Sequence, residues 1–238
     1  PIRLDMTVRK REDPTTIKRL YGRSQGKPLS ARQRTLMENL LPQISVAHEG
    51  EISSKMLFGD ELPLHFEIGF GAGEHLAYRA DLLPNHGFIG AEPFVNGVAK
   101  ALTQIDKKKL SNIRLHWGDA LQVLERLPNQ SLTMIYLLHP DPWPKNRHIK
   151  RRMMNDGPVR LFADKIKPGG EFRFGTDHPI YLRHALHVMQ RHKTDFEWQV
   201  TGRNSWEVRP SGWCETRYEN KARKTYGHEV WYFRYRRK

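Results

Sequence analysis

The chain has 238 residues, 38% of them apolar and 28% charged, and its 40 Lys and Arg exceed its 26 Asp and Glu, a formal net charge of +14. This excess favours a polyanionic partner, most simply nucleic acid. The single cysteine, Cys214, excludes an intramolecular disulfide, argues against a metal site and fits a reducing, cytoplasmic compartment. No segment approaches the roughly 18 consecutive apolar residues of a membrane-spanning helix, so no membrane partner is expected.

The N-terminal segment differs in character from the rest of the chain. Residues 1–34 are rich in Lys and Arg and show no clear hydrophobic periodicity. This predicts a basic, flexible arm in front of a main domain at residues 35–238. Ser30 is well placed to cap a short helix that runs to Leu41 and is stopped by Pro42.

From residue 62 onward, short apolar strands alternate with amphipathic helices. Helices are predicted from the end of the glycine-rich loop to residue 83 and at 94–108, 120–127, 156–165 and 179–192. Strands are predicted at 62–68, 87–91, 112–117, 132–138 and 171–175, with a closing pair at 196–200 and 228–236. Such alternation predicts an α/β fold whose mostly parallel sheet has helices on both faces. In this architecture, ligands bind at the carboxyl ends of the strands.

A glycine-rich loop follows the first of these strands. After Glu67, the glycines Gly69, Gly71 and Gly73 are spaced as G-x-G-x-G, which lets the backbone turn tightly and approach a ligand closely. A carboxylate at this strand end repels a pyrophosphate but attracts the sulfonium and α-amino groups of S-adenosyl-L-methionine. Taken alone, the motif also suits a plain strand–turn–helix connection.

Acidic residues also end the next two strands. Glu92 follows the second strand. At this position in such folds a nucleoside ribose presents two hydroxyls, and a carboxylate can accept hydrogen bonds from both. Asp119 follows the third strand, where it can accept from an adenine amino group or simply cap the next helix. Together, three acidic strand ends in succession resemble the S-adenosyl-L-methionine-binding edge of a class I methyltransferase.

The end of the fourth strand indicates the substrate. Three prolines stiffen the turn that presents Asp141, and Trp143 beside it offers a stacking face. A basic run follows, and it is either a grip for phosphates or a solvated face. Because it comes directly after a candidate catalytic strand end, we expect RNA contacts from Arg147, His148, Lys150, Arg151 and Arg152.

Together these motifs resemble the bacterial tRNA (guanine-N7-)-methyltransferase family. The resemblance extends from about residue 20 to the C-terminus and includes a basic Tyr-Gly-Arg in the arm. Its most specific parts are the Asp-Pro-Trp-Pro-Lys block and a Thr-Arg-Tyr-Glu-Asn-Lys-Ala block. The matching segments are 67–73, Glu92, 118–119, 141–152, 175–177 and 216–222.

The resemblance implies a Rossmann-like, seven-stranded, mostly parallel sheet with an antiparallel C-terminal strand. It implies an enzyme that makes 7-methylguanosine in the variable loop of tRNA. Glu67, Glu92, Asp119 and Asp141 would contact the methyl donor, and Asp141 would be catalytic. Contacts with the RNA or the target guanosine would come from Lys145, Asp177, Thr216, Arg217, Tyr218 and Glu219.

Methylation of guanine N7 makes modest chemical demands. N7 carries an in-plane lone pair and no proton, so no general base is needed, and positioning is the main task. Two alternatives remain: a class I methyltransferase that acts on another RNA, and a non-catalytic RNA-binding module on this scaffold. The Asp-Pro-Trp-Pro block argues against an amino-group methyltransferase, and the four acidic strand ends argue against a non-catalytic module.

Overall fold

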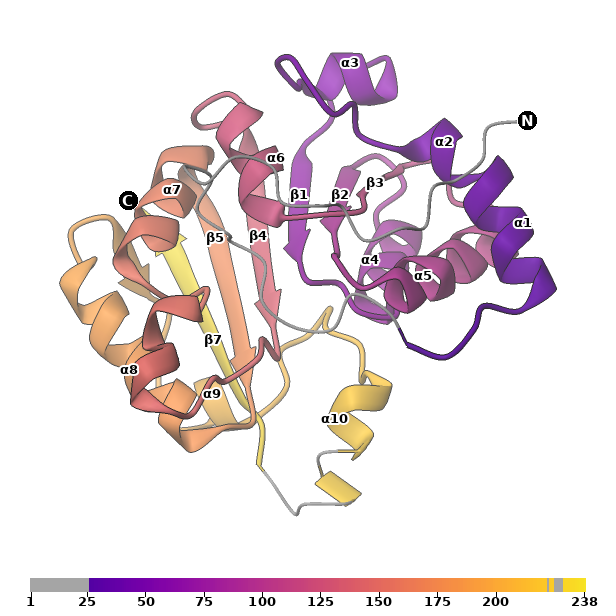
Figure 1. The fold of residues 1–238 in the computed structure, drawn as a ribbon. Helices are drawn as coiled ribbons and strands as arrows, with labels where there is room; N and C mark the ends of the chain where they lie inside the picture. Colours follow the sequence, from indigo (N-terminus) through magenta and orange to yellow (C-terminus); the bar gives the residue numbers. More distant parts are fainter. Residues whose placement is uncertain (1–25, 222, 225–228) are drawn as a thin grey trace.

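The structure is a computed structural model that describes residues 26–221, 223–224 and 229–238. Its centre is a seven-stranded sheet in the order β3-β2-β1-β4-β5-β7-β6 (Figure 1). All neighbouring strands from β3 to β5 are parallel, and β7 is antiparallel to both β5 and β6. The strands are β1 (Leu64–Ile68), β2 (Gly87–Ala91), β3 (Ile113–His116), β4 (Leu132–Leu138), β5 (Ile166–Thr176), β6 (Phe196–Trp198) and β7 (Trp231–Arg237).

Helices cover both faces of the sheet, as the alternating pattern predicts (Figure 1). One buried cluster joins Phe66, Ile135 and Phe172 of the sheet to α6 (Ala120–Arg126), α7 (Asp156–Lys165) and α8 (Pro179–Arg191). A second joins Phe88 and Leu115 to α1 (Ala31–Asn39), α4 (Glu74–Leu82) and α5 (Val95–Lys108). Shorter helices are α2 (Leu41–Ile44), α3 (Ser54–Phe58), α9 (Asn204–Glu207), α10 (Arg217–Lys221) and the 3-10 helix η1 (Asn146–Arg151).

The predicted elements match the observed ones closely where a strand or helix is bounded by turn residues. The bounds of β2, β4 and α7 coincide with the prediction. β5 starts earlier than predicted, at Ile166, because that residue pairs with Leu132 of β4. The pairing then shifts register, and the predicted Pro-Gly-Gly turn lies within the bounds of β5. The short helices α2, α3, α9, α10 and η1 are not predicted. The first helix ends at Asn39 and not at Leu41, and Pro42 lies in the first turn of α2, where a proline is tolerated.

The structure describes only the last part of the predicted N-terminal arm. Residues 1–25 of the predicted arm lie outside the described residues, and so does Ala222 of the Thr-Arg-Tyr-Glu block. The expected boundary at residue 34 falls inside α1. Ser30 does cap this helix: its Oγ accepts from the Gln33 amide at 3.3 Å, and the Gln33 side chain accepts from the Ser30 amide at 3.0 Å. Residues 31–34 of the predicted arm therefore belong to a helix that packs against α5.

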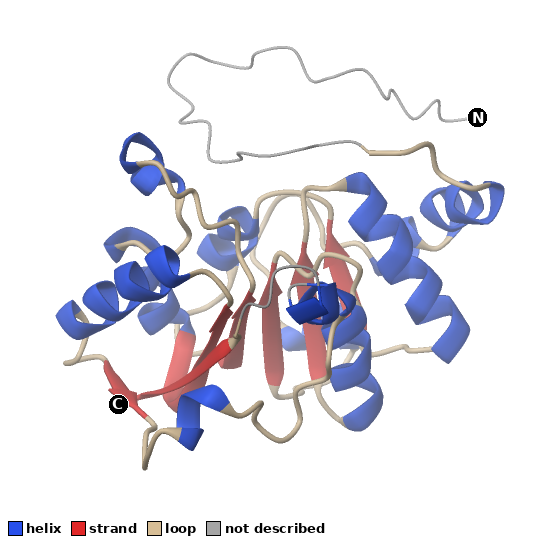
Figure 2. Ribbon diagram, turned by 90° about the horizontal axis from the view of Figure 1, so that it is seen from below, coloured by secondary structure: helices blue, strands red, loops and turns tan. Residues whose placement is uncertain are grey.

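The carboxyl ends of the parallel strands all lie at one edge of the molecule. Figure 2 looks at the sheet from this edge, with α10 in front of the strands. The glycine loop after β1, the loops after β2 and β3, and the long connection from β4 to α7 open at this edge. Within the described ranges, no helix has both the length and the apolar character to cross a bilayer.

Candidate active site

The glycine-rich loop after β1 has the open backbone that the sequence predicts. Gly69, Gly71 and Gly73 all have left-handed φ angles, at 67°, 55° and 72°. The amide of Gly69 donates to Ala91 O at 2.8 Å, which ties the loop to the end of β2. A Cβ at Gly69 or Gly71 would meet no atom within 4 Å. The loop therefore leaves room for a ligand to approach the main chain closely.

Glu67 lies at the base of this loop and is 4% exposed. Its Oε2 is 2.8 Å from Nδ1 of His75, which lies in the first turn of α4. His75 in turn meets the Tyr136 ring edge-on at 4.7 Å between centroids. The carboxylate therefore has a defined orientation before any ligand binds. Sequence reasoning missed His75, although its place just after the glycine loop was visible.

Glu92 bridges the glycine loop and the start of α5. One carboxylate oxygen accepts from the Gly71 amide at 2.8 Å, and the other accepts from the Phe94 amide at 2.8 Å. Desolvation raises the pKa of Glu92, the two amide hydrogen bonds oppose that rise, and the charges of Asp141 and Glu67 add to it. The carboxylates after β1, β2 and β4 thus interact electrostatically, as expected for one shared site.

Asp119 follows β3 and is 4% exposed. It caps α6, since its Oδ1 accepts from the Leu121 amide at 3.0 Å. The capping role that the sequence left open is therefore real. The indole of Trp117 donates to Pro93 O at 3.2 Å and so joins the loops after β2 and β3. β1, β2 and β3 are neighbours in the sheet, so the acidic residues at their ends form a continuous row.

Asp141 lies on an unusual loop. The residues two positions before and after it, His139 and Trp143, have φ angles of +51° and +41°, which non-glycine residues rarely adopt. Asp141 is exposed, yet desolvation by the surrounding loop raises the pKa of its carboxyl. Backbone strain of this kind is concentrated at functional sites.

Helix α10 carries part of the expected substrate contacts and is anchored at two points. Arg217 binds Glu74 of α4 through both its backbone amide and its side chain. Glu219 is 2% exposed, and its Oε1 is 3.2 Å from Nε2 of His139. Tyr218, by contrast, is 52% exposed, with its ring 5.2 Å from that of His139. The α10 segment therefore bridges the start of α4 and the end of β4.

Glu219 has its partners within the protein. The sequence predicts that Glu219 contacts the substrate, but its carboxylate is directed into the protein. Besides His139, it interacts with Arg209 at 3.1 Å and with the Tyr232 hydroxyl at 3.3 Å. Desolvation alone would raise the pKa of Glu219, but the His139 hydrogen bond and the nearby charges hold it below its usual range. In this structure Glu219 joins α10 to β4.

The remaining expected RNA and substrate contacts divide by exposure. Lys145, Arg147 and Lys150 are exposed, whereas His148 and Arg151 are partly buried around Trp143. Asp177 follows β5 at the same edge, and the Thr216 hydroxyl accepts from the Glu219 amide at 3.2 Å.

Arg152, for which the sequence also predicts an RNA contact, differs from the rest of the basic run in its burial. The side chain of Arg152 is buried, with 4% exposure, and its guanidinium donates to backbone carbonyls of the protein. These bonds direct Nε and Nη2 of Arg152 toward the protein rather than toward solvent.

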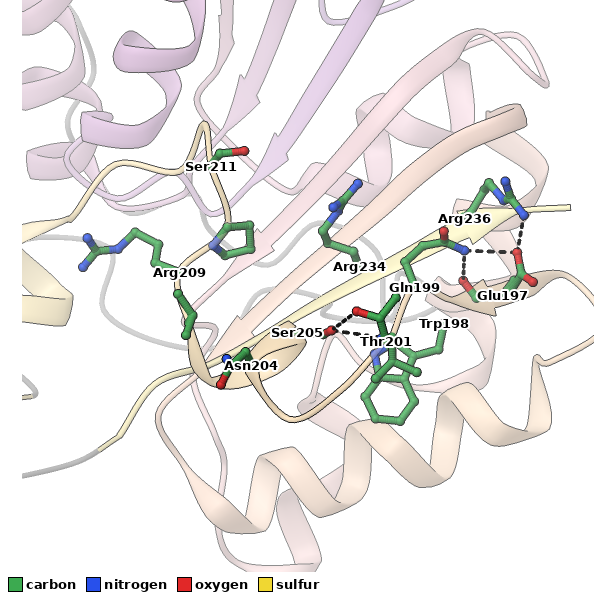
Figure 3. Close-up of a pocket in the computed structure, with 13 residues that line it drawn as sticks. Glu197, Trp198, Gln199, Thr201, Asn204, Ser205, Arg209, Ser211, Arg234 and Arg236 are labelled. Atoms are coloured by element: carbon green, nitrogen blue, oxygen red, sulfur yellow. Dashed lines mark hydrogen bonds and ion pairs between the residues drawn. The ribbon is translucent and has the colours of Figure 1, made fainter.

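A cavity of about 590 Å³ lies over β6 and β7, away from the acidic row (Figure 3). Three arginines line it, and each is paired with a carboxylate: Arg209 with Glu219, Arg234 with Glu171, and Arg236 with Glu197. Because these charges are neutralised within the protein, the cavity is a poor match for a polyanion. The acidic row at the strand ends remains the best candidate site.

Comparisons with known proteins agree with this geometry. The family model described as "Putative methyltransferase" matches residues 61–232. The tRNA (guanine-N(7)-)-methyltransferase of Erythrobacter litoralis is 69% identical, over 98% of this chain and 100% of that protein. The protein of the same name from Agrobacterium fabrum is 43% identical, over 92% and 94% of the two chains.

Solved structures extend the comparison to the fold. An rRNA methylase from Streptococcus thermophilus aligns with a TM-score of 0.50 at 8% identity, over 88% of this chain and 99% of that one. A 16S rRNA methyltransferase aligns with a TM-score of 0.52 at 14% identity, over 82% and 99%. At these identities the likeness concerns the fold alone, which is that of the class I methyltransferases.

Proposed function

The chain belongs to the tRNA (guanine-N(7)-)-methyltransferase family, and from this premise we propose that it transfers the methyl group of S-adenosyl-L-methionine to N7 of a guanine in tRNA, in the cytoplasm. The observation that carries the proposal is the row of buried acidic side chains after β1, β2 and β3 around an open glycine loop. The formal charge of +14 supports a nucleic-acid substrate.

The residues of the acidic row fit the methyl donor. Gly69 and Gly71 face open space, so the main chain allows a close approach. The carboxylates of Glu67, Glu92 and Asp119 suit the amino group, the ribose hydroxyls and the adenine amino group of the donor in turn. When bound, S-adenosyl-L-methionine supplies an electrophilic methyl group.

The protein's part in the reaction is to bind and orient the guanine. N7 carries no proton that must be removed, so Asp141 does not act as a general base. It instead accepts a hydrogen bond from the guanine and so orients it. We assign Asp141 and Asp177 to the N1 and N2 donors of the guanine, which fixes N7 in line with the methyl–sulfur bond. Alignment of this kind can supply roughly 7–11 kcal/mol. The carboxylates also stabilise the positive charge that develops on the base.

The phosphate grip comes from exposed cations next to this site. Lys145, Arg147 and Lys150 are exposed on and beside η1, which directly follows the Asp141 loop. Arg151 lies over the Trp143 ring at 5.0 Å and presents a planar cation next to an aromatic face. Contacts of this type supply affinity without sequence choice and make binding sensitive to salt.

The test is methyl transfer from labelled S-adenosyl-L-methionine to tRNA that lacks the modification, followed by nucleoside analysis. We expect 7-methylguanosine from the wild type and a loss of turnover in Asp141→Ala. Asp81→Ala is the matched control, because Asp81 is a surface residue near the far end of α4 that pairs with Lys108.

Each alternative outcome has a clear meaning. Label on a different nucleoside refutes the proposed substrate and leaves the fold assignment intact. Donor binding without transfer favours an RNA-binding module. Wild-type turnover in Asp141→Ala refutes the role of Asp141.

A further inference from the structure

Arg152 differs from the other cations of the basic run in where its charge is directed. Its Nε donates to Pro142 O at 3.0 Å, and its Nη2 donates to Trp143 O at 3.0 Å. Its guanidinium carbon lies 5.7 Å from the ring centroid of Tyr181, a fully buried residue of α8. The side chain therefore connects the body of the domain to the loop that carries Asp141.

No carboxylate of the described residues forms an ion pair with Arg152. Its positive charge is balanced by the two loop carbonyls and the face of the Tyr181 ring. Burial of an unpaired charge is expensive, so proteins rarely keep one without a specific use. Two adjacent carbonyls are a good match for the rigid fork of a guanidinium, which donates along two parallel directions.

The backbone of the Asp141 loop needs outside contacts of the kind that the Arg152 guanidinium supplies. Positive φ angles are strained for residues that carry a Cβ, so those of His139 and Trp143 persist only when surrounding contacts hold them. Pro140 and Pro142 remove two backbone donors, so the loop has few amides of its own with which to stabilise its shape. The Arg152 bonds end on Pro142 and Trp143, on the C-terminal side of Asp141.

The other end of the loop has an independent anchor. His139 is buried against Glu219, which α10 contributes from a distant part of the sequence. Asp141 thus lies between two anchored points of the loop. The His139–Glu219 contact precedes it, and the hydrogen bonds from Arg152 follow it. Its position is set by buried groups and does not depend on its own exposed side chain.

We propose that Arg152 is a positioning residue that holds the Asp141 loop in its strained conformation and makes no contact with RNA. This inference rests on the proposed function, since Asp141 is the residue to be positioned. It separates the last arginine of the basic run from Lys145, Arg147 and Lys150, whose side chains are exposed.

The test compares Arg152→Lys with Arg147→Ala. Lysine keeps the charge of Arg152 but cannot donate to two carbonyls at once, so the loop loses one of its two bonds. We expect kcat to fall about tenfold or more, because misplacement by about 1 Å costs roughly 100-fold. The tRNA dissociation constant and its salt dependence should stay within twofold of the wild type. Arg147→Ala should instead weaken tRNA binding and reduce the slope of log K against log salt by about 1.

A second measurement does not depend on turnover. Amide hydrogen exchange at Asp141 and Trp143 should be faster in Arg152→Lys than in the wild type, while exchange in the middle of α7 should be unchanged. A mere loss of global stability would accelerate both regions together.

The outcomes separate the inference from the proposed function. If Arg152→Lys weakens tRNA binding and flattens its salt dependence at unchanged kcat, Arg152 is an RNA contact and the inference is wrong. Wild-type kcat and wild-type loop exchange in Arg152→Lys also overturn it. If the wild type makes no 7-methylguanosine, the proposed function fails, and loop exchange alone then decides whether Arg152 holds the loop.

Discussion

Replacement of Gly73 by alanine tests the packing behind the glycine loop. Gly73 is the N-terminal cap of α4 and has a φ of 72°, where a residue with a Cβ costs roughly 1–2 kcal/mol. A Cβ there would also lie 2.6 Å from Ala101 Cβ and 2.9 Å from Ala101 Cα, on the buried side of α5. Overpacking of this kind adds about 1–3 kcal/mol. We therefore expect Gly73→Ala to lower the free energy of unfolding by about 2–5 kcal/mol.

Gly59 provides the matched control. It has a φ of 82° and ends α3, and a Cβ added there would have no atom within 4 Å, so Gly59→Ala should cost only the conformational part, about 1–2 kcal/mol. Urea unfolding measures both free energies. Titration calorimetry with S-adenosyl-L-methionine should show weaker binding for Gly73→Ala and wild-type binding for Gly59→Ala.

A double mutant isolates the contact between the two elements. Ala101→Gly removes the methyl group that a Cβ at residue 73 would strike but leaves the Cα of residue 101, so the cost of Gly73→Ala should fall by only part of the about 1–3 kcal/mol of overpacking in the Ala101→Gly background. The reasoning is refuted if Gly73→Ala and Gly59→Ala destabilise the protein equally. It is also refuted if Ala101→Gly restores nothing.

Two further predictions follow from the carboxyl pKa values. Desolvation raises the pKa of Glu92, and a carboxylate accepts from ribose hydroxyls better than a carboxylic acid does. The affinity for S-adenosyl-L-methionine, measured by calorimetry, should therefore begin to fall at a pH above the ordinary glutamate pKa of about 4.3. An affinity that stays constant down to that pH contradicts the assignment of Glu92 to the ribose. Glu219→Gln should lower the free energy of unfolding by about 3 kcal/mol at pH 7, since it removes the buried carboxylate that pairs with Arg209. The pKa of Glu219 is lowered in the folded state, so its carboxylate stabilises the fold above the ordinary glutamate pKa, and this stabilisation is lost as the pH falls through the pKa of the folded state. Urea unfolding should therefore show a smaller difference between wild type and Glu219→Gln at pH 4 than at pH 7, and an equal difference at both pH values argues against this reasoning.

Much of the acidic row was predictable because its signals are local. Short apolar runs bounded by turn residues identify β2 and β4 to the residue, and an acidic residue just past a parallel strand must lie at the carboxyl edge of the sheet. The glycine spacing likewise predicts a tight turn of the backbone, and all three glycines have positive φ angles. None of these conclusions needs knowledge of which distant segments pack together.

The side chains of the Asp141 loop were harder to predict because their neighbours are remote in sequence. Glu219 and His139 are 80 residues apart, and no pattern near either one indicates that they meet. Arg152 has the same chemistry as the arginine before it, so the basic run predicts one role for both.

The sequence by itself therefore determined the alternation of strands and helices and the chemistry of the strand ends. Only the tertiary structure decided which charges face solvent and which face the core. The reason is physical: a strand end is defined by its own few residues, whereas burial depends on what packs over a side chain. For Arg152 that cover is Tyr181 of α8, together with the loop of Pro142 and Trp143 to which its guanidinium donates.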